Sequence, residues 1–137
     1  MKHLTICREY PPAPSGGIGT YAAHISRLLA ETGETVHVIG QLWSGAENSL
    51  EERSGGKLII HRLPLEDWSS SGQRPSSLLK DREVKALFES GFYPQCFSWQ
   101  AALLTEQLVE EEGIDIIEAQ EYEAPLYYFQ LRRALGL

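Results

Sequence analysis

Apolar and polar residues along the chain follow two alternating patterns. Short runs rich in apolar and β-branched residues predict β-strands at 4–7, 35–39, 57–63 and 115–119. Pro64 follows the third run directly and marks its end. The last run is almost entirely apolar, so we expect this strand to be buried on both faces of its sheet.

Between these runs the apolar residues recur at helical spacing. A first helix is predicted from Ile18 up to a stop at Gly33, with an apolar stripe formed by Ile18, Tyr21, Ala22, Ile25, Leu28 and Leu29. A short helix is predicted at 78–90 and a longer one at 95–112, with a stripe of Phe97, Ala101, Leu104 and Leu108. A last helix is predicted to contain Pro125 in its first turn and to end near Leu135. The polar segments 41–56 and 66–77 predict loops.

Strands that alternate with helices predict an α/β fold. We expect residues 1–137 to form a single domain, a Rossmann-like, doubly wound and mostly parallel sheet with helices on both faces. Ligands of such sheets bind in the crevice beyond the carboxyl ends of the strands. Residues that follow the predicted strands are therefore the first candidates for a site.

Charge and composition narrow the classes of partner. The formal net charge is −7, and no basic patch is visible, so we expect no binding to nucleic acid. Cys7 and Cys96 lie far apart in the sequence, and neither they nor the histidines have metal-ligand spacing. We therefore expect reduced cysteines and no metal site. The sequence shows no signal peptide and no membrane-spanning apolar run, which predicts a cytoplasmic protein.

The segment between the first strand and the first helix is rich in glycine. Gly16, Gly17 and Gly19 lie at the predicted start of the helix and are followed by Thr20. The N–H groups at a helix start are unpaired and carry a partial positive charge, so they attract phosphates and carboxylates. Glycine lets the backbone approach such a ligand. The segment predicts a phosphate-binding loop, and a tight turn without a ligand is the alternative.

The same glycines fit the dinucleotide-binding pattern G-x-G-x-x-A at 17–22. Two features disfavour a dehydrogenase. A proline-rich segment separates the glycines from the preceding strand, and Gln41 stands at the end of the second strand, where an acidic residue would hold a ribose hydroxyl.

Acidic residues gather after the last predicted strand. Glu118, Glu121 and Glu123 surround Tyr122 at its carboxyl end. Carboxylates at this edge of a sheet can accept hydrogen bonds from ligands rich in hydroxyl groups, such as sugars. Alternatively, Glu121 and Glu123 complement the dipole of the following helix, and Glu118 only ends the strand.

Two segments together resemble a known family. Tyr10-Pro11-Pro12 and Ser15-Gly16-Gly17-Ile18-Gly19-Thr20-Tyr21, followed by the helix that ends at Gly33, resemble the opening of retaining GT-B glycosyltransferases. The most similar group includes glycogen-synthase-like and cell-surface-polysaccharide enzymes. Residues 114–123 resemble a later strand of that group with its acidic loop. The resemblance covers nearly the whole chain, although residues 41–95 are generic.

The resemblance implies one half of a two-domain enzyme. It implies that Gly16, Gly17, Gly19 and Thr20 reach the diphosphate of a nucleoside diphosphate sugar, and that Tyr21, Glu121, Tyr122 and Glu123 lie on the acceptor side. The chain then corresponds to a truncated amino-terminal half of the GT-B fold, inactive alone and without the carboxyl-terminal nucleotide-sugar domain. The implied reaction transfers a hexose to a glycan or lipid-linked acceptor with retention, without cofactor, metal or a catalytic residue in this half. The full enzyme would act in the cytoplasm, at the inner face of the membrane.

Other expectations stay open beside this one. We expect the chain to self-associate as a dimer through the region where the sheet would continue. A free-standing, non-catalytic α/β module that binds a phosphorylated or sugar ligand, or a protein partner, is the principal alternative function. A dinucleotide oxidoreductase is the third.

Overall fold

The computed structural model of the chain describes residues 1–13, 16–64 and 92–136. In chain order its elements are β1 (Lys2–Ile6), α1 (Gly17–Glu31), β2 (Thr35–Gln41), β3 (Leu50–Arg53), the 3-10 turn η1 (Ser54–Gly56), β4 (Leu58–Leu63), α3 (Tyr93–Glu112), β5 (Ile116–Ala119) and α4 (Tyr127–Ala134). The loop expected at 66–77 and the short helix expected at 78–90 lie outside the described residues.

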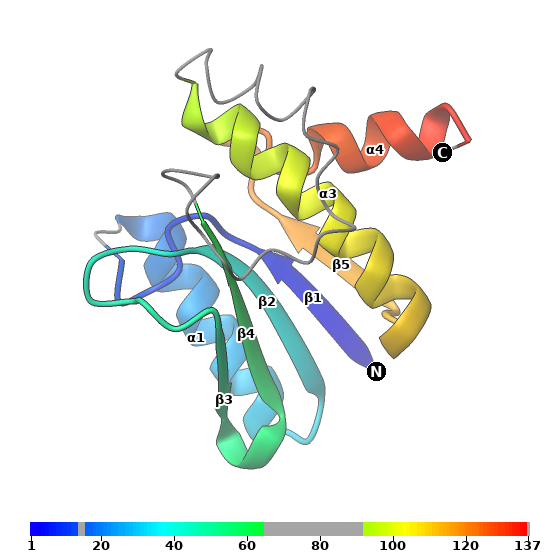
Figure 1. Ribbon diagram of the computed structural model, residues 1–137. Helices are drawn as coiled ribbons and strands as arrows, with labels where there is room; N and C mark the ends of the chain where they lie inside the picture. Colours follow the sequence, from blue (N-terminus) through cyan, green and yellow to red (C-terminus); the bar gives the residue numbers. More distant parts are fainter. Residues whose placement is uncertain (14–15, 65–91, 137) are drawn as a thin grey trace.

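The strands form one sheet in the order β3-β4-β2-β1-β5 (Figure 1). β1, β2, β4 and β5 run parallel, and β3 runs antiparallel to β4. The chain therefore moves from β1 through β2 to β4 on one side of β1 and then returns to place β5 on the other side. This mostly parallel α/β sheet confirms the expected class and is compatible with a Rossmann-like fold. The reversal of direction between β1 and β5 is a topological switch point, where open α/β sheets bind ligands.

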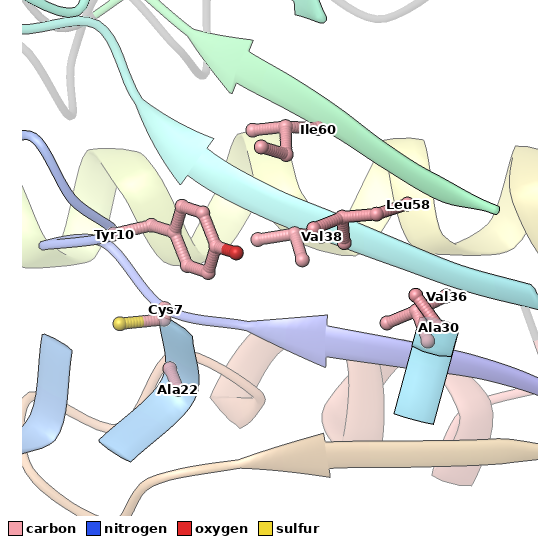
Figure 2. Close-up of a cluster of buried hydrophobic side chains, with 8 residues drawn as sticks. All are labelled: Cys7, Tyr10, Ala22, Ala30, Val36, Val38, Leu58 and Ile60. Carbon is pink, nitrogen blue, oxygen red and sulfur yellow. The ribbon is translucent and has the colours of Figure 1, made fainter. Parts of the chain in front are cut away.

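Helices cover both faces of the sheet. On one face α1 packs over a buried cluster of Cys7, Tyr10, Ala22, Ala30, Val36, Val38, Leu58 and Ile60 (Figure 2). On the other face α3 contributes Phe97, Ala101 and Leu108 to a second cluster with Leu4, Ile6, Ile39 and Leu63. Successive strand residues alternate between the two clusters, as the pleat of a strand requires. Both expected layers of helices are thus present among the described residues.

α1 meets the sheet through small side chains together with part of the apolar stripe expected from the sequence, since Ala22 is buried and Ile18 and Leu29 pack against the same cluster. Its buried positions are Gly19, Ala22, Ser26 and Ala30. Tyr21 and Leu28, which belong to the expected stripe, are 45% and 50% exposed. Small residues let the helix lie close to the strands, so the contact face is set by side-chain size as much as by apolar character.

The two edge strands also differ from expectation. Residues 41–56, expected to be a loop, contain β3, whose sequence Leu-Glu-Glu-Arg is mostly exposed. An edge strand facing solvent needs little apolar alternation, so its polar sequence concealed it. β5 was expected to be buried on both faces, but β1 is its one partner among the described strands and Ile116 is 41% exposed. Only Ile117 and Ala119 of β5 pack against the cluster under α3.

The longer helices keep most of their predicted limits. α3 begins at Tyr93, slightly before the expected start, and ends at Glu112 as expected, where Gly113 caps it in the left-handed conformation with a φ of 67°. α4 begins at Tyr127, so Pro125 precedes the helix and does not lie in its first turn. None of the helices in the described part of the chain has both the length and the apolar character that crossing a bilayer requires.

Two histidines lie in contact within the sheet layer that faces α3. His37 on β2 and His61 on β4 have ring centroids 5.4 Å apart and nearly parallel planes, with Nδ1 of His37 3.1 Å from Nε2 of His61. His37 is 2% exposed. Burial, followed by the neighbouring His37, lowers the pKa of His61 from 6.5 to about 4. Burial also lowers the pKa of His37, against the charge of Glu112, which raises it.

We predict that this pair makes the fold sensitive to mild acid. The unfolded chain protonates His61 near pH 6.5 and the folded chain only near pH 4, so stability is complete at neutral pH and falls as the pH drops through this window. Between pH 7 and pH 5 the loss from His61 amounts to about 2 kcal/mol. Urea unfolding of the wild type and of His61→Gln at both pH values measures it. An equal loss of stability in the two proteins contradicts the prediction.

Candidate functional site

A pocket opens at the switch point, between the carboxyl ends of β1 and β5. It contains about 360 Å³ of empty space, part of which is continuous with solvent. Residues 6–9 at the end of β1 form one side, and Gln120, Tyr122, Glu123 and Pro125, after β5, form another. Ile18 in the first turn of α1 and Pro94 and Phe97 of α3 complete the lining. The pocket therefore lies where residues from four separate elements meet.

The glycine segment places an uncapped helix start beside this pocket. Gly16 is the N-cap residue of α1 and makes no side-chain cap, so within the described residues the first-turn N–H groups receive no capping bond from it. Gly16 and Gly17 are exposed, whereas Gly19 is buried against the sheet. The Thr20 hydroxyl donates to the carbonyl of Gly16 at 3.1 Å, within its own helix. Of the four predicted residues, Gly16 and Gly17 thus present accessible backbone.

Arg8 is the principal cation of the pocket. Its Nε donates to Oε2 of Glu123 at 2.6 Å and its Nη2 donates to Oε1 at 3.0 Å, a bidentate pair between the ends of β1 and β5. Its Nη1 donates to Oε1 of Gln41 at 3.1 Å, and the guanidinium lies 5.4 Å from the ring centroid of Trp43. The Arg8 side chain is only 16% exposed. Planar bidentate pairing of this kind is geometrically specific as well as strong.

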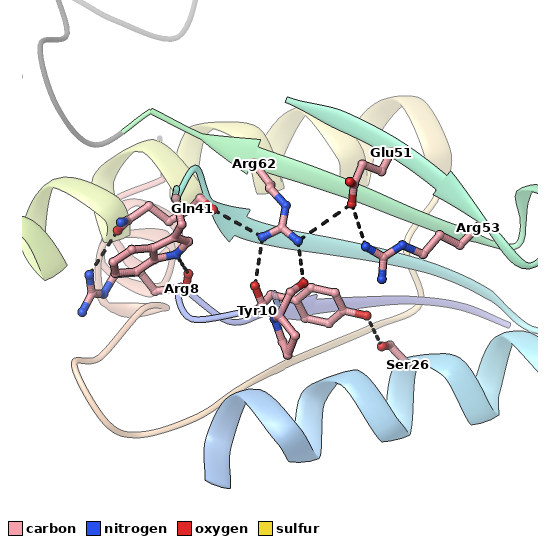
Figure 3. Close-up of polar contacts among 9 residues, drawn as sticks. Arg8, Tyr10, Ser26, Gln41, Glu51, Arg53 and Arg62 are labelled. Atoms are coloured by element: carbon pink, nitrogen blue, oxygen red, sulfur yellow. Dashed lines mark hydrogen bonds and ion pairs between the residues drawn. The ribbon is translucent and has the colours of Figure 1, made fainter. Parts of the chain in front are cut away.

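A second arginine, Arg62, lies buried beneath the loop that leads from β1 to α1 (Figure 3). Its side chain is 0% exposed. Nη1 donates to the carbonyl of Tyr10 at 2.9 Å, and Nη2 donates to the carbonyl of Pro11 at 2.6 Å. Oε2 of Glu51 on β3 lies 3.8 Å from Nη2, and burial lowers the pKa of the guanidinium while Glu51 raises it. Arg62 thus fixes the backbone of Tyr10 and Pro11, after β1.

The loop after β1 packs closely against β2, and Gly40 and Tyr10 make this close packing possible. A Cβ at Gly40 would lie 3.2 Å from Cβ of Tyr10 and 3.3 Å from the carbonyl oxygen of Cys7, tighter than ordinary van der Waals contact. The Tyr10 side chain is buried, and its hydroxyl oxygen lies 2.7 Å from Oγ of Ser26 on α1. The loop is therefore tied to β2, to β4 and to the helix that it precedes.

The predicted acceptor-side residues divide into three groups. Glu123 lies in the pocket, paired with Arg8, and Tyr122 lines the pocket with a side chain that is 66% exposed. Tyr21 is directed away toward β5, where its hydroxyl donates to Oε1 of Glu118 at 2.9 Å, and this hydrogen bond raises the pKa of Tyr21. Glu121 is exposed and does not line the pocket. The sequence therefore predicted two side chains of this pocket and two of its surroundings.

The two arginines of the site, Arg8 and Arg62, were not identified from the sequence as site residues, and neither were Gln41 and Trp43, which contact Arg8. Arg8 follows β1, Gln41 is the last residue of β2 and Trp43 follows it, so their position at the carboxyl ends of predicted strands was the available indication. Arg62 lies on the same face of β4 as the buried Leu58 and Ile60, but an arginine normally indicates a solvent-facing side chain, so its residue type concealed its burial. Within the described residues no three side chains of His, Cys, Asp or Glu are grouped to hold a metal ion.

Neither protein-family models nor curated proteins match the sequence.

We predict that Arg62 contributes far more to stability than a surface arginine. Arg62→Met removes the donors to the carbonyls of Tyr10 and Pro11 and leaves them inside the fold, which costs about 3 kcal/mol of unfolding free energy. Arg27→Met is the matched control, because the Arg27–Glu31 pair on α1 is more than half exposed on both sides and contributes at most about 0.5 kcal/mol. Urea unfolding compares the two variants. Equal shifts of their midpoints would show that the buried contacts add nothing.

Proposed function

We propose that this domain is the amino-terminal, acceptor-side half of a retaining GT-B glycosyltransferase. The observation that supports this most directly is that the first turn of α1, through Ile18 next to Gly17, and the acidic loop after β5 both border one pocket. A transferase needs these two chemistries side by side, because a diphosphate leaves while a hydroxyl-bearing acceptor approaches. The family resemblance of the same two segments supports the proposal from the sequence.

In this proposal the complete enzyme transfers a hexose from a nucleoside diphosphate sugar to a glycan or lipid-linked acceptor, and this domain alone is inactive. The bond between the anomeric carbon and the diphosphate breaks, and a bond to an acceptor oxygen forms on the same face of the sugar. N–H groups at Gly16 and Gly17 would stabilise the charge that develops on the leaving diphosphate, without a divalent metal. Tyr122 and Glu121, both exposed beside the pocket, would bind acceptor hydroxyl groups. The donor's nucleotide would be held chiefly by a second, carboxyl-terminal domain.

The structure bears differently on the two alternative functions. Gln41, at the end of β2, is 1% exposed and accepts a hydrogen bond from Arg8, so it is not available to a ribose hydroxyl. This arrangement disfavours a dinucleotide oxidoreductase. A non-catalytic module would use the same pocket for a phosphorylated or sugar ligand, and turnover of a nucleotide sugar separates it from a transferase. The two cysteines are free and buried, which fits the reducing cytoplasm that we propose as the location.

We also propose that the chain forms a homodimer through β5. β5 has an unpaired edge among the described strands, and Ile116 on it is 41% exposed. We expect a concentration-dependent dimer in sedimentation equilibrium and a monomer for Ile116→Lys. A wild type that stays monomeric at high concentration contradicts this.

We predict that Gly17→Val abolishes sugar transfer without unfolding the domain. A Cβ at Gly17 has open space around it in the part of the chain that the structure describes, so the folded state accommodates the larger side chain. A diphosphate at the helix start would instead be held away from the N–H groups, lowering turnover by about a hundredfold.

The measurement is release of nucleoside diphosphate from a panel of nucleotide sugars, with the protein purified from its source cells. The urea midpoint of the variant is the control for folding. Turnover that is unchanged in Gly17→Val rejects the role of the glycine loop, and no release from any donor rejects the transferase.

A further inference from the structure

The two partners of the Arg8–Glu123 pair differ in how firmly the rest of the protein holds them. The Arg8 guanidinium has contacts independent of Glu123, namely the Gln41 side chain and the face of Trp43. Its backbone is fixed as well, because the carbonyl of Arg8 accepts from Nε1 of Trp43 at 3.0 Å and from the backbone N–H of Gln41 at 3.2 Å. Removal of Glu123 would therefore leave Arg8 in place.

Trp43 itself is locked. Its backbone N–H donates to the carbonyl of Ala46 at 3.1 Å and its carbonyl accepts from the N–H of Ala46 at 2.8 Å. The indole is thus a fixed surface beside the guanidinium. The edge of the guanidinium formed by Nε and Nη2 is directed at Glu123, in the loop after β5. This edge has the geometry that binds two oxygen atoms of one planar or tetrahedral oxyanion.

Glu123 approaches that edge from strained backbone. Its φ is 63° and that of Ala124 is 46°, two consecutive residues other than glycine in the left-handed region. The loop is held there by the Ala124 N–H, which donates to the carbonyl of Glu121, and by the Ser98 hydroxyl near the carbonyls of Ala124 and Pro125. Residues held in this region by their surroundings are concentrated at ligand-binding sites, which is consistent with a role for this loop in the pocket.

We propose that Arg8 is the phosphoryl-binding residue of the pocket and that Glu123 occupies its place until a ligand arrives. The ligand is a phosphorylated molecule, one phosphoryl group of which takes both donors of Arg8 and displaces the Glu123 carboxylate. Glu9, whose Oε1 lies 3.9 Å from Nη2 of Arg8, adds negative charge and raises the threshold for weakly charged anions. A doubly charged phosphoryl group overcomes this threshold better than a carboxylate does.

This inference rests on the proposed function, which places the ligand at the switch-point pocket. It adds that the phosphoryl group of this ligand binds to a side chain of this domain, Arg8. Glu123 then regulates access to the pocket and does not bind acceptor hydroxyl groups. Phosphoryl binding at Arg8 is required under the inference whether or not a sugar is transferred.

The test is a titration of the 137-residue chain with inorganic pyrophosphate at constant ionic strength, followed in every variant by isothermal titration calorimetry and, where Arg8 is present, by the NMR signal of its Nε–H group. We expect a saturable shift, a dissociation constant about tenfold lower in Glu123→Gln, and loss of binding in Arg8→Lys, which keeps the charge without the planar pair of donors. Acetate at the same concentrations should not bind.

Glu106→Gln is the matched control. Glu106 accepts a similar bidentate pair from Arg132, with Nε at 2.6 Å and Nη2 at 3.2 Å, between α3 and α4 and away from this pocket. The variant changes net charge by the same amount as Glu123→Gln and should leave the dissociation constant unchanged. Equal tightening in both variants, unchanged affinity in Glu123→Gln, or acetate binding as strong as that of pyrophosphate overturns the inference. Pyrophosphate binding with this pattern but no sugar transfer supports the inference while rejecting the proposed transferase.

Discussion

The fold and its pocket both depend on one buried charge, the guanidinium of Arg62. A parallel sheet leaves carbonyl groups at the carboxyl ends of its strands, and each must find a donor when it is covered. Arg62 reaches from β4 across Gly40 of β2 to supply the carbonyls of Tyr10 and Pro11. A guanidinium suits this task because its several donors lie in one rigid plane and it stays charged even when buried. The loop after β1 thereby gains a defined path without secondary structure of its own.

The path of that loop decides where α1 begins, and small residues decide how α1 lies. Tyr10 fills the space between the loop and the sheet and meets the hydroxyl of Ser26, and Ala22 and Ala30 bring the helix close to the strands. The helix fixed in this way places Ile18, in its first turn, at the pocket beside the end of β1. The position of the candidate site is therefore a consequence of core packing. The glycines at the start of α1 add only that the backbone there is accessible to a ligand.

The sequence predicted those features that depend on local pattern. The runs that became β1, β2 and β4, the αL stop at Gly113 and the apolar stripe of α3 follow from residue type and spacing alone. β3 was missed and the burial of β5 misjudged, because the position of a strand within the sheet is not encoded in its own residues. Arg8 and Arg62 were missed for a related reason: their partners lie up to 115 positions away, and a charged residue in a strand normally indicates solvent. The glycine and glutamate clusters were visible because each is contiguous in sequence.

The distribution of charge gives the pocket a selectivity that net charge alone would not suggest. A chain with a formal net charge of −7 repels polyanions at long range, but exposed charges are screened beyond about 10 Å in physiological salt. At shorter range the proposed ligand would take the guanidinium edge of Arg8 that Glu123 now occupies, close to the first turn of α1. An extended polyanion that placed one phosphate in the pocket would hold many others against the acidic surface, where they are repelled. A small phosphorylated molecule has no such additional phosphates. The proposed phosphoryl site is therefore better suited to a small phosphorylated ligand than to an extended polyanion.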